Sequence, residues 1–113
     1  MTVGNNGSFC VSEDVNWTTM DKGIQRKVLS YNKYLMLVHV RFEKGAVGKL
    51  HHHYHRQVSF IEEGVFEVTI NNITKVLKKG DSYIVEPEEV HGVVALENGA
   101  IIDIFTPARE EFI

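Results

Sequence analysis

The chain has 113 residues, enough for one domain with a sizeable core and too few for a second domain. Its composition is 43% hydrophobic and 24% charged with a formal net charge of -3, as in an ordinary globular protein, and it lacks the basic excess typical of nucleic-acid binding. No apolar run approaches the roughly 20 residues of a membrane span, and the N-terminus lacks the basic-then-apolar order of a signal peptide. We therefore expect a cytoplasmic protein that binds small molecules or further copies of itself, with no nucleic acid and no membrane as partner.

The first stretch, residues 1–14, is rich in Gly, Asn and Ser and shows no hydrophobic periodicity. It predicts a flexible leader, followed by one barrel domain at residues 15–113. The single cysteine, Cys10, lies in this leader. An internal disulfide and a thiolate zinc cage are therefore both excluded.

The segment from Tyr34 to Phe42 is the longest predicted strand. Residues of both parities along it are largely apolar, which is expected of a strand covered on two faces. The sequence alone favours a core position for His39 in this strand.

Shorter predicted strands follow in chain order, at residues 65–70, 73–77, 82–85, 93–95 and 100–105. The first two flank Asn71-Asn72, a pair that tolerates positive φ, and so predict a tight hairpin. Pro107 is tolerated at a first helical position, so residues 107–113 are expected to form a helical turn. Short strands at close intervals predict an all-β sandwich or barrel.

A dense run of histidines, residues 51–55 with Tyr54 among them, is the most unusual feature of the sequence. In an extended segment, residues two apart project to the same face, so His51 and His53 can present their imidazoles side by side. Gln57 shares this parity, and His91 precedes a later strand from which it could close a metal site. The alternatives are an expression tag, which would sit at a terminus, and a solvated polar rim.

The spacing of these residues resembles the cupin motifs. The first motif is matched by Gly45, five residues, His51, one residue, His53, three residues, Gln57, six residues and Gly64. The second motif is matched at Gly80 and His91, although Glu86, Glu88 and Ala95 replace the usual Pro, Gly and Asn. The resemblance implies a single jelly-roll-like cupin barrel that holds one divalent metal ion with His51, His53, Gln57 and His91.

Cupins usually have Glu at the position of Gln57. Three neutral imidazoles and an amide leave the charge of the metal uncompensated, so the ion should be a stronger Lewis acid. This ligand set suits zinc, nickel, manganese or iron, and the sequence does not choose among them. We expect non-redox chemistry, such as ring opening or isomerisation.

The end of the chain carries a narrower resemblance. The segment Asp103-Ile-Phe-Thr-Pro-Ala-Arg-Glu-Glu-Phe112, together with His51-x-His53-x-His55-x-Gln57, looks like the pectin-degradation cupins that linearise unsaturated uronates. That family usually has Pro and Glu where this chain has Tyr54 and Arg56. The resemblance implies that Asp103, Phe105 and Arg109 line the substrate site. On the sequence alone, Asp103 could instead cap a turn or pair with Arg109, and Phe105 could be plain core.

The reaction implied by the resemblance converts a 4,5-unsaturated uronate of the galacturonate type to linear 5-keto-4-deoxyuronate, in the breakdown of pectin or alginate. The alternatives are a noncatalytic metal-containing cupin that binds a sugar or other small molecule, and a small cupin dioxygenase or isomerase. A small barrel with exposed edge strands also predicts a homodimer.

Overall fold

The computed structural model describes residues 3, 4 and 7–113. In chain order, the elements of this described part are η1(Ser12–Asp14), β1(Thr18–Asp21), β2(Ile24–Tyr31), β3(Met36–Phe42), β4(Val47–His51), β5(Arg56–Glu63), β6(Val65–Ile70), β7(Ile73–Lys78), β8(Ser82–Val85), β9(His91–Ala95), β10(Gly99–Thr106) and η2(Glu110–Phe112), where η marks a short 3-10 helix. The predicted all-β class is confirmed. A search of the same residues for a helix both long and apolar enough to cross a membrane finds none.

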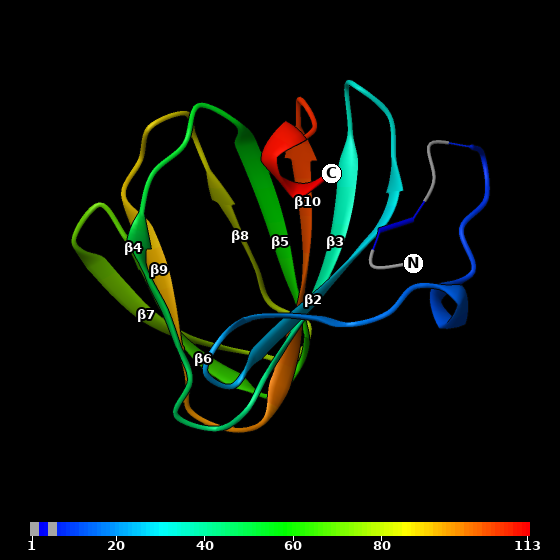
Figure 1. Cartoon of the computed structure of the whole chain (residues 1–113). Helices are drawn as coiled ribbons and strands as arrows, with labels where there is room; N and C mark the ends of the chain where they lie inside the picture. The colour runs from blue at the N-terminus through cyan, green and yellow to red at the C-terminus, as the bar shows by residue number, and fades with distance from the viewer. Residues whose placement is uncertain (1–2, 5–6) are drawn as a thin grey trace.

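The strands form two antiparallel sheets that face each other as a sandwich (Figure 1). The larger sheet has the order β1-β2-β3-β10-β5-β8, and the smaller one has the order β4-β9-β6-β7. The two sheets diverge toward the upper end in Figure 1, where the C-terminal turn η2 also lies. The crossovers place β10, the last strand, between β3 and β5 at the middle of the larger sheet.

The predicted hairpin is present with its predicted turn. Strands β6 and β7 are paired from Val65↔Lys78 to Ile70↔Ile73, and Asn71 and Asn72 have φ values of 49° and 67°. Two consecutive positive φ values are the geometry of a type I′ turn, whose twist matches that of the flanking strands.

The strand predicted from Tyr34 to Phe42 begins two residues later, at Met36. The side-chain oxygen of Asn32 accepts hydrogen bonds from the backbone N–H groups of Tyr34 and Leu35, at 2.8 and 2.9 Å. These bonds hold the two residues in a turn, so pairing with the neighbouring strands starts only after them.

The helical turn predicted from Pro107 is displaced along the chain. Pro107 follows a cis peptide bond, and the 3-10 turn η2 begins at Glu110. The prediction of a turn in this segment was correct, but the prediction of Pro107 as its first residue was wrong.

One end of the sandwich is filled by a single apolar cluster, contributed by both sheets. Phe42 from β3 and Phe66 from β6 meet edge to face at its centre, with ring centroids 5.0 Å apart. The buried members of the cluster are Ile24, Phe42, Ala46, Ile61, Phe66, Val68, Val93, Ala95 and Ile101. The packing of this end leaves the other end of the sandwich open for polar residues.

Part of the N-terminal segment contacts the larger sheet. Val3 forms a parallel bridge with Val28 of β2, and the N–H of Gly4 donates to the carbonyl of Val28 at 2.6 Å. Residues 1, 2, 5 and 6 of the predicted leader lie outside the described residues. The domain boundary after residue 14 stays a prediction.

Gly64, in the turn between β5 and β6, provides a test of the packing between the strands. Its φ is +85°, and a Cβ atom there would lie 2.6 Å from the carbonyl oxygen of Asn98. We expect Gly64→Ala to lower the free energy of unfolding by roughly 3 kcal/mol, from backbone strain and steric overlap together. Gly80→Ala is the matched control, because Gly80 has a φ of +94° but open space around the new Cβ. For Gly80→Ala, urea unfolding should show a free energy of unfolding lowered by only about 1 kcal/mol. If the two variants lose the same free energy of unfolding, the packing argument is contradicted.

Candidate metal and substrate site

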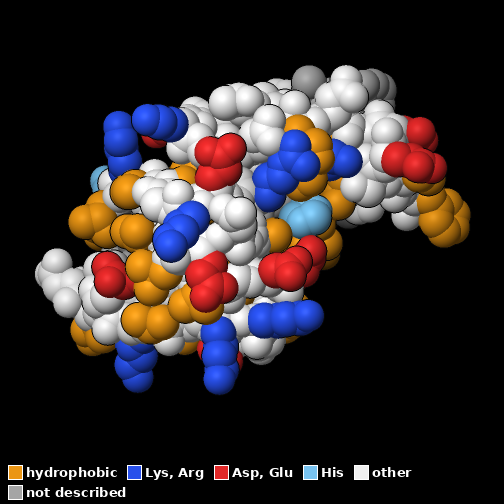
Figure 2. All heavy atoms as spheres, turned by 90° about the horizontal axis from the view of Figure 1, so that it is seen from below, with side chains coloured by type: hydrophobic (Ala, Val, Ile, Leu, Met, Phe, Trp, Pro, Cys, Tyr) orange, Lys and Arg blue, Asp and Glu red, His pale blue; other side chains and the backbone are white. Residues whose placement is uncertain are grey.

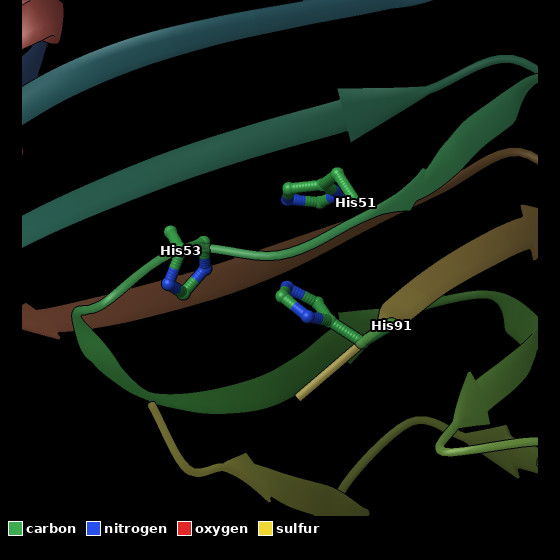
Figure 3. A group of neighbouring side chains, drawn as sticks. All are labelled: His51, His53 and His91. Atoms are coloured by element: carbon green, nitrogen blue, oxygen red, sulfur yellow. The ribbon is translucent and has the colours of Figure 1, made fainter. Parts of the chain in front are cut away.

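Three histidines meet at the open end of the sandwich (Figure 3). His51 is the last residue of β4, His53 lies in the loop before β5, and His91 is the first residue of β9. His51 and His91 are also register partners across the β4–β9 pair. One ring nitrogen from each histidine lies within 4.8 Å of the others, so the three could hold a single metal ion.

The other ring nitrogen of each histidine is held by the backbone. The Nδ1 atoms of His51, His53 and His91 lie 2.9, 2.9 and 2.8 Å from the carbonyl oxygens of Lys49, His55 and Glu89, respectively. A carbonyl oxygen only accepts, so each Nδ1 carries the proton. Each Nε2 therefore presents a lone pair, which is the usual arrangement of a metal-binding histidine.

Gln57, the first inward-facing residue of β5, completes the group. Its Nε2 donates to Ser59 Oγ at 2.9 Å and to Asp103 Oδ1 at 3.3 Å, and this fixes the orientation of the amide. Its Oε1 then lies 3.1 Å from Nε2 of His53. Two acceptors with lone pairs face each other here, an arrangement that a cation between them would stabilise.

Burial favours the neutral form of two of these imidazoles. It lowers the pKa of His91 to about 4 and also lowers the pKa of His53, and the nearby His51 acts in the same direction on both. His91 Nε2 is buried without a hydrogen-bond partner among the described residues, which is costly for a polar atom unless something binds it. The donor set therefore fits a divalent metal ion.

Asp103, on β10, lies beside this group. Its Oδ1 accepts a hydrogen bond of 2.6 Å from Ser59 Oγ in addition to the bond from Gln57. Burial raises the pKa of Asp103 to about 6, against the effect of these two hydrogen bonds. A turn cap is excluded, because Asp103 pairs within the sheet with Val38 and Ser59. The other alternative was an ion pair between Asp103 and Arg109. The guanidinium of Arg109 instead donates a hydrogen bond to the carboxylate of Glu111, at 3.2 Å.

A cavity of about 390 Å³ joins the histidines to the predicted substrate residues. Its walls include His51, Gln57, His91, Asp103, Phe105 and Arg109, together with Arg26, Lys49, Tyr83 and Phe112. The structure thus brings all seven predicted site residues together, because His53, although it is not one of these wall residues, belongs to the histidine group and lies 3.1 Å from Gln57. The volume suits a ligand of monosaccharide size.

Phe105 and Arg109 are organised by aromatic packing. Phe105 is almost fully buried in a second apolar cluster, and its ring meets the ring of His53 edge to face at 5.7 Å. The guanidinium of Arg109 lies 5.2 Å from the ring centre of Phe105 and 4.3 Å from that of Phe112. Most of the Phe105 side chain therefore belongs to the core, as the alternative interpretation held, and the remainder lines the cavity.

A second guanidinium, from Arg26, escaped the sequence analysis. It lies 3.6 Å from the ring centre of Phe112, and burial lowers its pKa, with Arg109 acting in the same direction. Arg26 has the same parity in β2 as the buried residues Ile24 and Val28. The sequence does carry a signal for Arg26 as a site residue: it is a charged residue at a core-facing position of a strand.

The structure also places two histidines outside the proposed ligand set, and His39 differs from the sequence-based expectation. His39 is not a core histidine: it faces outward, contacts Trp17 edge to face, and lies 3.3 Å from Glu62. His55, for which the sequence left open an exposed rim position, is buried beside His53 and Phe105. The ring of His55 lies 5.5 Å from that of His53, centre to centre, so it packs against a residue of the site.

Comparison with known proteins places this geometry in a family. Residues 38–105 match the family model described as "Cupin domain". The chain is a cupin. It is 39% identical over 107 residues to the pectin degradation protein KdgF of Dickeya dadantii, a match that covers 93% of this cupin and 97% of that protein.

Solved structures give the same relationship. The cupin superimposes on KdgF from Halomonas sp. with a TM-score of 0.90 and 37% identity, covering 95% of this chain and 99% of that one. An RmlC-like cupin from Shewanella frigidimarina gives a TM-score of 0.91 and 41% identity, covering 95% and 96% of the two chains. The predicted cupin fold and the predicted kinship with the pectin-degradation cupins are both confirmed.

Proposed function

We propose that this cupin opens the ring of a 4,5-unsaturated uronate of the galacturonate type and releases linear 5-keto-4-deoxyuronate, in pectin or alginate breakdown. The observation that carries the proposal is the hydrogen-bonded group of Gln57, Ser59 and Asp103, which puts a carboxyl group on the wall of the cavity that His51 and His91 also line. The relative from Dickeya dadantii is named a pectin degradation protein, which supports a substrate of this class.

The metal site proposed here consists of Nε2 of His51, His53 and His91 with Oε1 of Gln57. A divalent metal ion bound there would supply a Lewis acid for the negative charge that develops on the ring oxygen. The neutral ligand set leaves that acidity undiminished, and zinc, nickel, manganese and iron all accept such ligands.

The reaction moves one proton within the substrate. The C1 hydroxyl loses its proton, the bond between C1 and the ring oxygen breaks, and C1 becomes an aldehyde. The electrons of that bond pass to the ring oxygen, which becomes the enol oxygen at C5. Protonation at C4 then turns C5 into a ketone. We propose that Asp103 accepts the first proton and delivers a proton to C4, because its carboxyl group is at the cavity wall and is held in place by Ser59.

Binding of the substrate carboxylate is assigned to Arg109. Its planar guanidinium suits a carboxylate, and its stacking on Phe105 and Phe112 fixes its direction. Arg26, on the same aromatic ring, adds a second positive charge to the cavity. Phe105 holds Arg109 and offers its remaining exposed edge to the sugar.

The proposal is tested by incubating purified, metal-loaded protein with unsaturated uronate monomer and following the loss of the conjugated double bond in the far ultraviolet. We expect loss much faster than in buffer, without a requirement for oxygen. Binding without conversion would instead indicate a noncatalytic sugar-binding cupin, and strict oxygen dependence would indicate a dioxygenase.

Gln57 offers a specific test of the proposed arrangement. Glu at this position would place a carboxylate oxygen in place of the amide nitrogen, about 3.3 Å from Asp103 Oδ1. Two carboxyl groups this close share a proton, so Asp103 would lose its freedom to exchange one. We expect Gln57→Glu to lower kcat by about 10-fold or more while the protein keeps its metal, because a carboxylate is also a good ligand.

The matched control is Gln25→Glu, on the outer face of β2, where Gln25 bonds Arg41. This variant should keep the kcat of the unmodified protein. Unchanged kcat in Gln57→Glu, measured by the ultraviolet assay alongside metal analysis, would refute the proposed link between Gln57 and Asp103.

A further inference from the structure

Two guanidinium groups share one aromatic ring in the wall of the cavity. The guanidinium of Arg26, on β2, lies 3.6 Å from the centre of the Phe112 ring, and that of Arg109, just before η2, lies 4.3 Å from the same centre. The Phe112 ring in turn meets the Phe105 ring edge to face, with centroids 6.0 Å apart. Both arginines line the cavity, so residues far apart in the sequence bring two positive charges to one part of its wall.

Only one of these guanidinium groups forms an ion pair within the described part of the chain. Nε and Nη2 of Arg109 donate to the same oxygen, Oε2 of Glu111, at 3.4 and 3.2 Å. The ion pairs among the described residues do not include Arg26. Burial lowers the pKa of Arg26, Arg109 acts in the same direction, and Glu111 opposes both. Glu111 therefore offsets part of the positive charge of both arginines.

The grouping of two positive charges differs from the charge pattern at the other end of the molecule. Figure 2 shows that end, where Lys and Arg side chains are interspersed with Asp and Glu. Positive charges close together repel each other, and the repulsion is stronger where the groups are partly buried. An anion that contacts both arginines relieves it, and the planar guanidinium suits the two oxygens of a carboxylate.

We propose that Arg26 and Arg109 bind the substrate carboxylate together, and that Glu111 occupies this two-arginine site until the substrate displaces it. The inference rests on the ring-opening function proposed above and adds Glu111 as the residue that sets the affinity for a sugar acid. The side chain of Glu111 is 53% exposed and belongs to the short turn η2, so it can move into solvent. An exposed ion pair contributes little free energy, which makes such an exchange possible.

The exchange of carboxylates affects which sugars the site distinguishes. A sugar acid replaces the carboxylate of Glu111 with its own, so Arg109 keeps an anionic partner throughout. A neutral sugar has no group to exchange, and its affinity does not depend on Arg26 or Glu111. Specificity for a charged ligand is a difference between two affinities, and these two residues change only one of them.

The test measures the binding of D-galacturonate to purified, metal-loaded protein by titration calorimetry. This sugar acid lacks the C4=C5 double bond, so it cannot give the 5-keto product and reports binding alone. We expect Arg26→Gln to raise its Kd by about 10-fold or more, because a charge-assisted contact is lost. Glu111→Gln should lower the Kd by about 3-fold, because the competing carboxylate is gone. The affinity for galactose, the neutral sugar, should not change in either variant.

Two variants with the same changes of charge are the controls. Arg41→Gln lies on the outer face of β3, where Arg41 is exposed and bonds Gln25. Glu110→Gln removes the exposed carboxylate that precedes Glu111 in η2. Both should keep the Kd of the unmodified protein. Arg26→Lys replaces Arg26→Gln if that variant fails to fold by circular dichroism, and it should raise the Kd by about 3-fold because Lys lacks the flat group that stacks on Phe112.

Three results would overturn the two-arginine site. They are no measurable binding of galacturonate by the unmodified protein, an unchanged Kd in the Arg26 variant, and weaker binding in Glu111→Gln, which would mean that Glu111 only orients Arg109. Failure of the proposed reaction gives a different result. If galacturonate binds as expected but unsaturated uronate is not converted, the two-arginine site stands and the ring-opening proposal falls.

Discussion

His91→Ala should abolish metal binding and lower turnover of the unsaturated uronate by about 100-fold or more. His91 is the most buried of the three histidines, and its pKa, lowered to about 4 by burial, means that no proton competes for its Nε2 near neutral pH. Its loss leaves His51 at the end of an edge strand and His53 in a loop, without the residue that links them. Metal content after dialysis, measured by plasma mass spectrometry, checks the prediction directly.

The control for this variant is His52→Ala. His52 lies between two proposed ligands in the sequence, but its side chain is exposed and its Nδ1 lies 3.2 Å from a carboxylate oxygen of Glu88. It should retain metal and activity. Retention of one equivalent of metal by His91→Ala would refute the assignment of His91 as a ligand.

Asp103→Asn should lower kcat by about 100-fold or more and leave the metal content unchanged. The amide keeps the shape of the side chain and can still accept from Ser59, but it cannot take or deliver a proton. Because Asp103 contacts Gln57 only through the amide nitrogen of Gln57, the oxygen proposed as metal ligand keeps its position.

Two readouts distinguish this role from a structural one. The ultraviolet assay gives kcat, and metal analysis of the same sample shows whether the site is intact. Glu97→Gln, an exposed carboxyl group in the turn before β10, is the control and should behave as the unmodified protein. Loss of metal from Asp103→Asn would contradict the proposed role, since Asp103 would then be needed to build the metal site.

The sequence correctly predicted features that depend on residues close together in the chain. The Asn71-Asn72 pair predicted the hairpin because its geometry depends on two residues. The first cupin motif predicted that His51 and His53 are neighbours because both lie in one strand and the connection that follows it. The start of β3 was predicted two residues too early, because the hydrogen bonds from the backbone N–H groups of Tyr34 and Leu35 to Asn32 hold both residues in a turn before the strand.

Features that depend on sheet order could not be predicted in this way. Ser59 and Asp103 are 44 residues apart and become neighbours because β5 pairs with β10. Parity separates the two faces of a strand, but it does not say which face is inside when both are apolar. For that reason His39 was placed in the core, and the outward direction of Ile104 and Val58 became evident only from the paired strands.

The apolar cluster is separate from the open end of the sandwich, so residues at the open end can be substituted without disturbing it. The cluster around Phe42 and Phe66 joins the two sheets without help from residues at the mouth. Tyr54 and Arg56, where similar pectin-degradation cupins usually have Pro and Glu, are both exposed and lie next to the histidines. Substitutions there leave the interior packing untouched, so the side chains at the mouth of the site can change in evolution with little loss of folding stability.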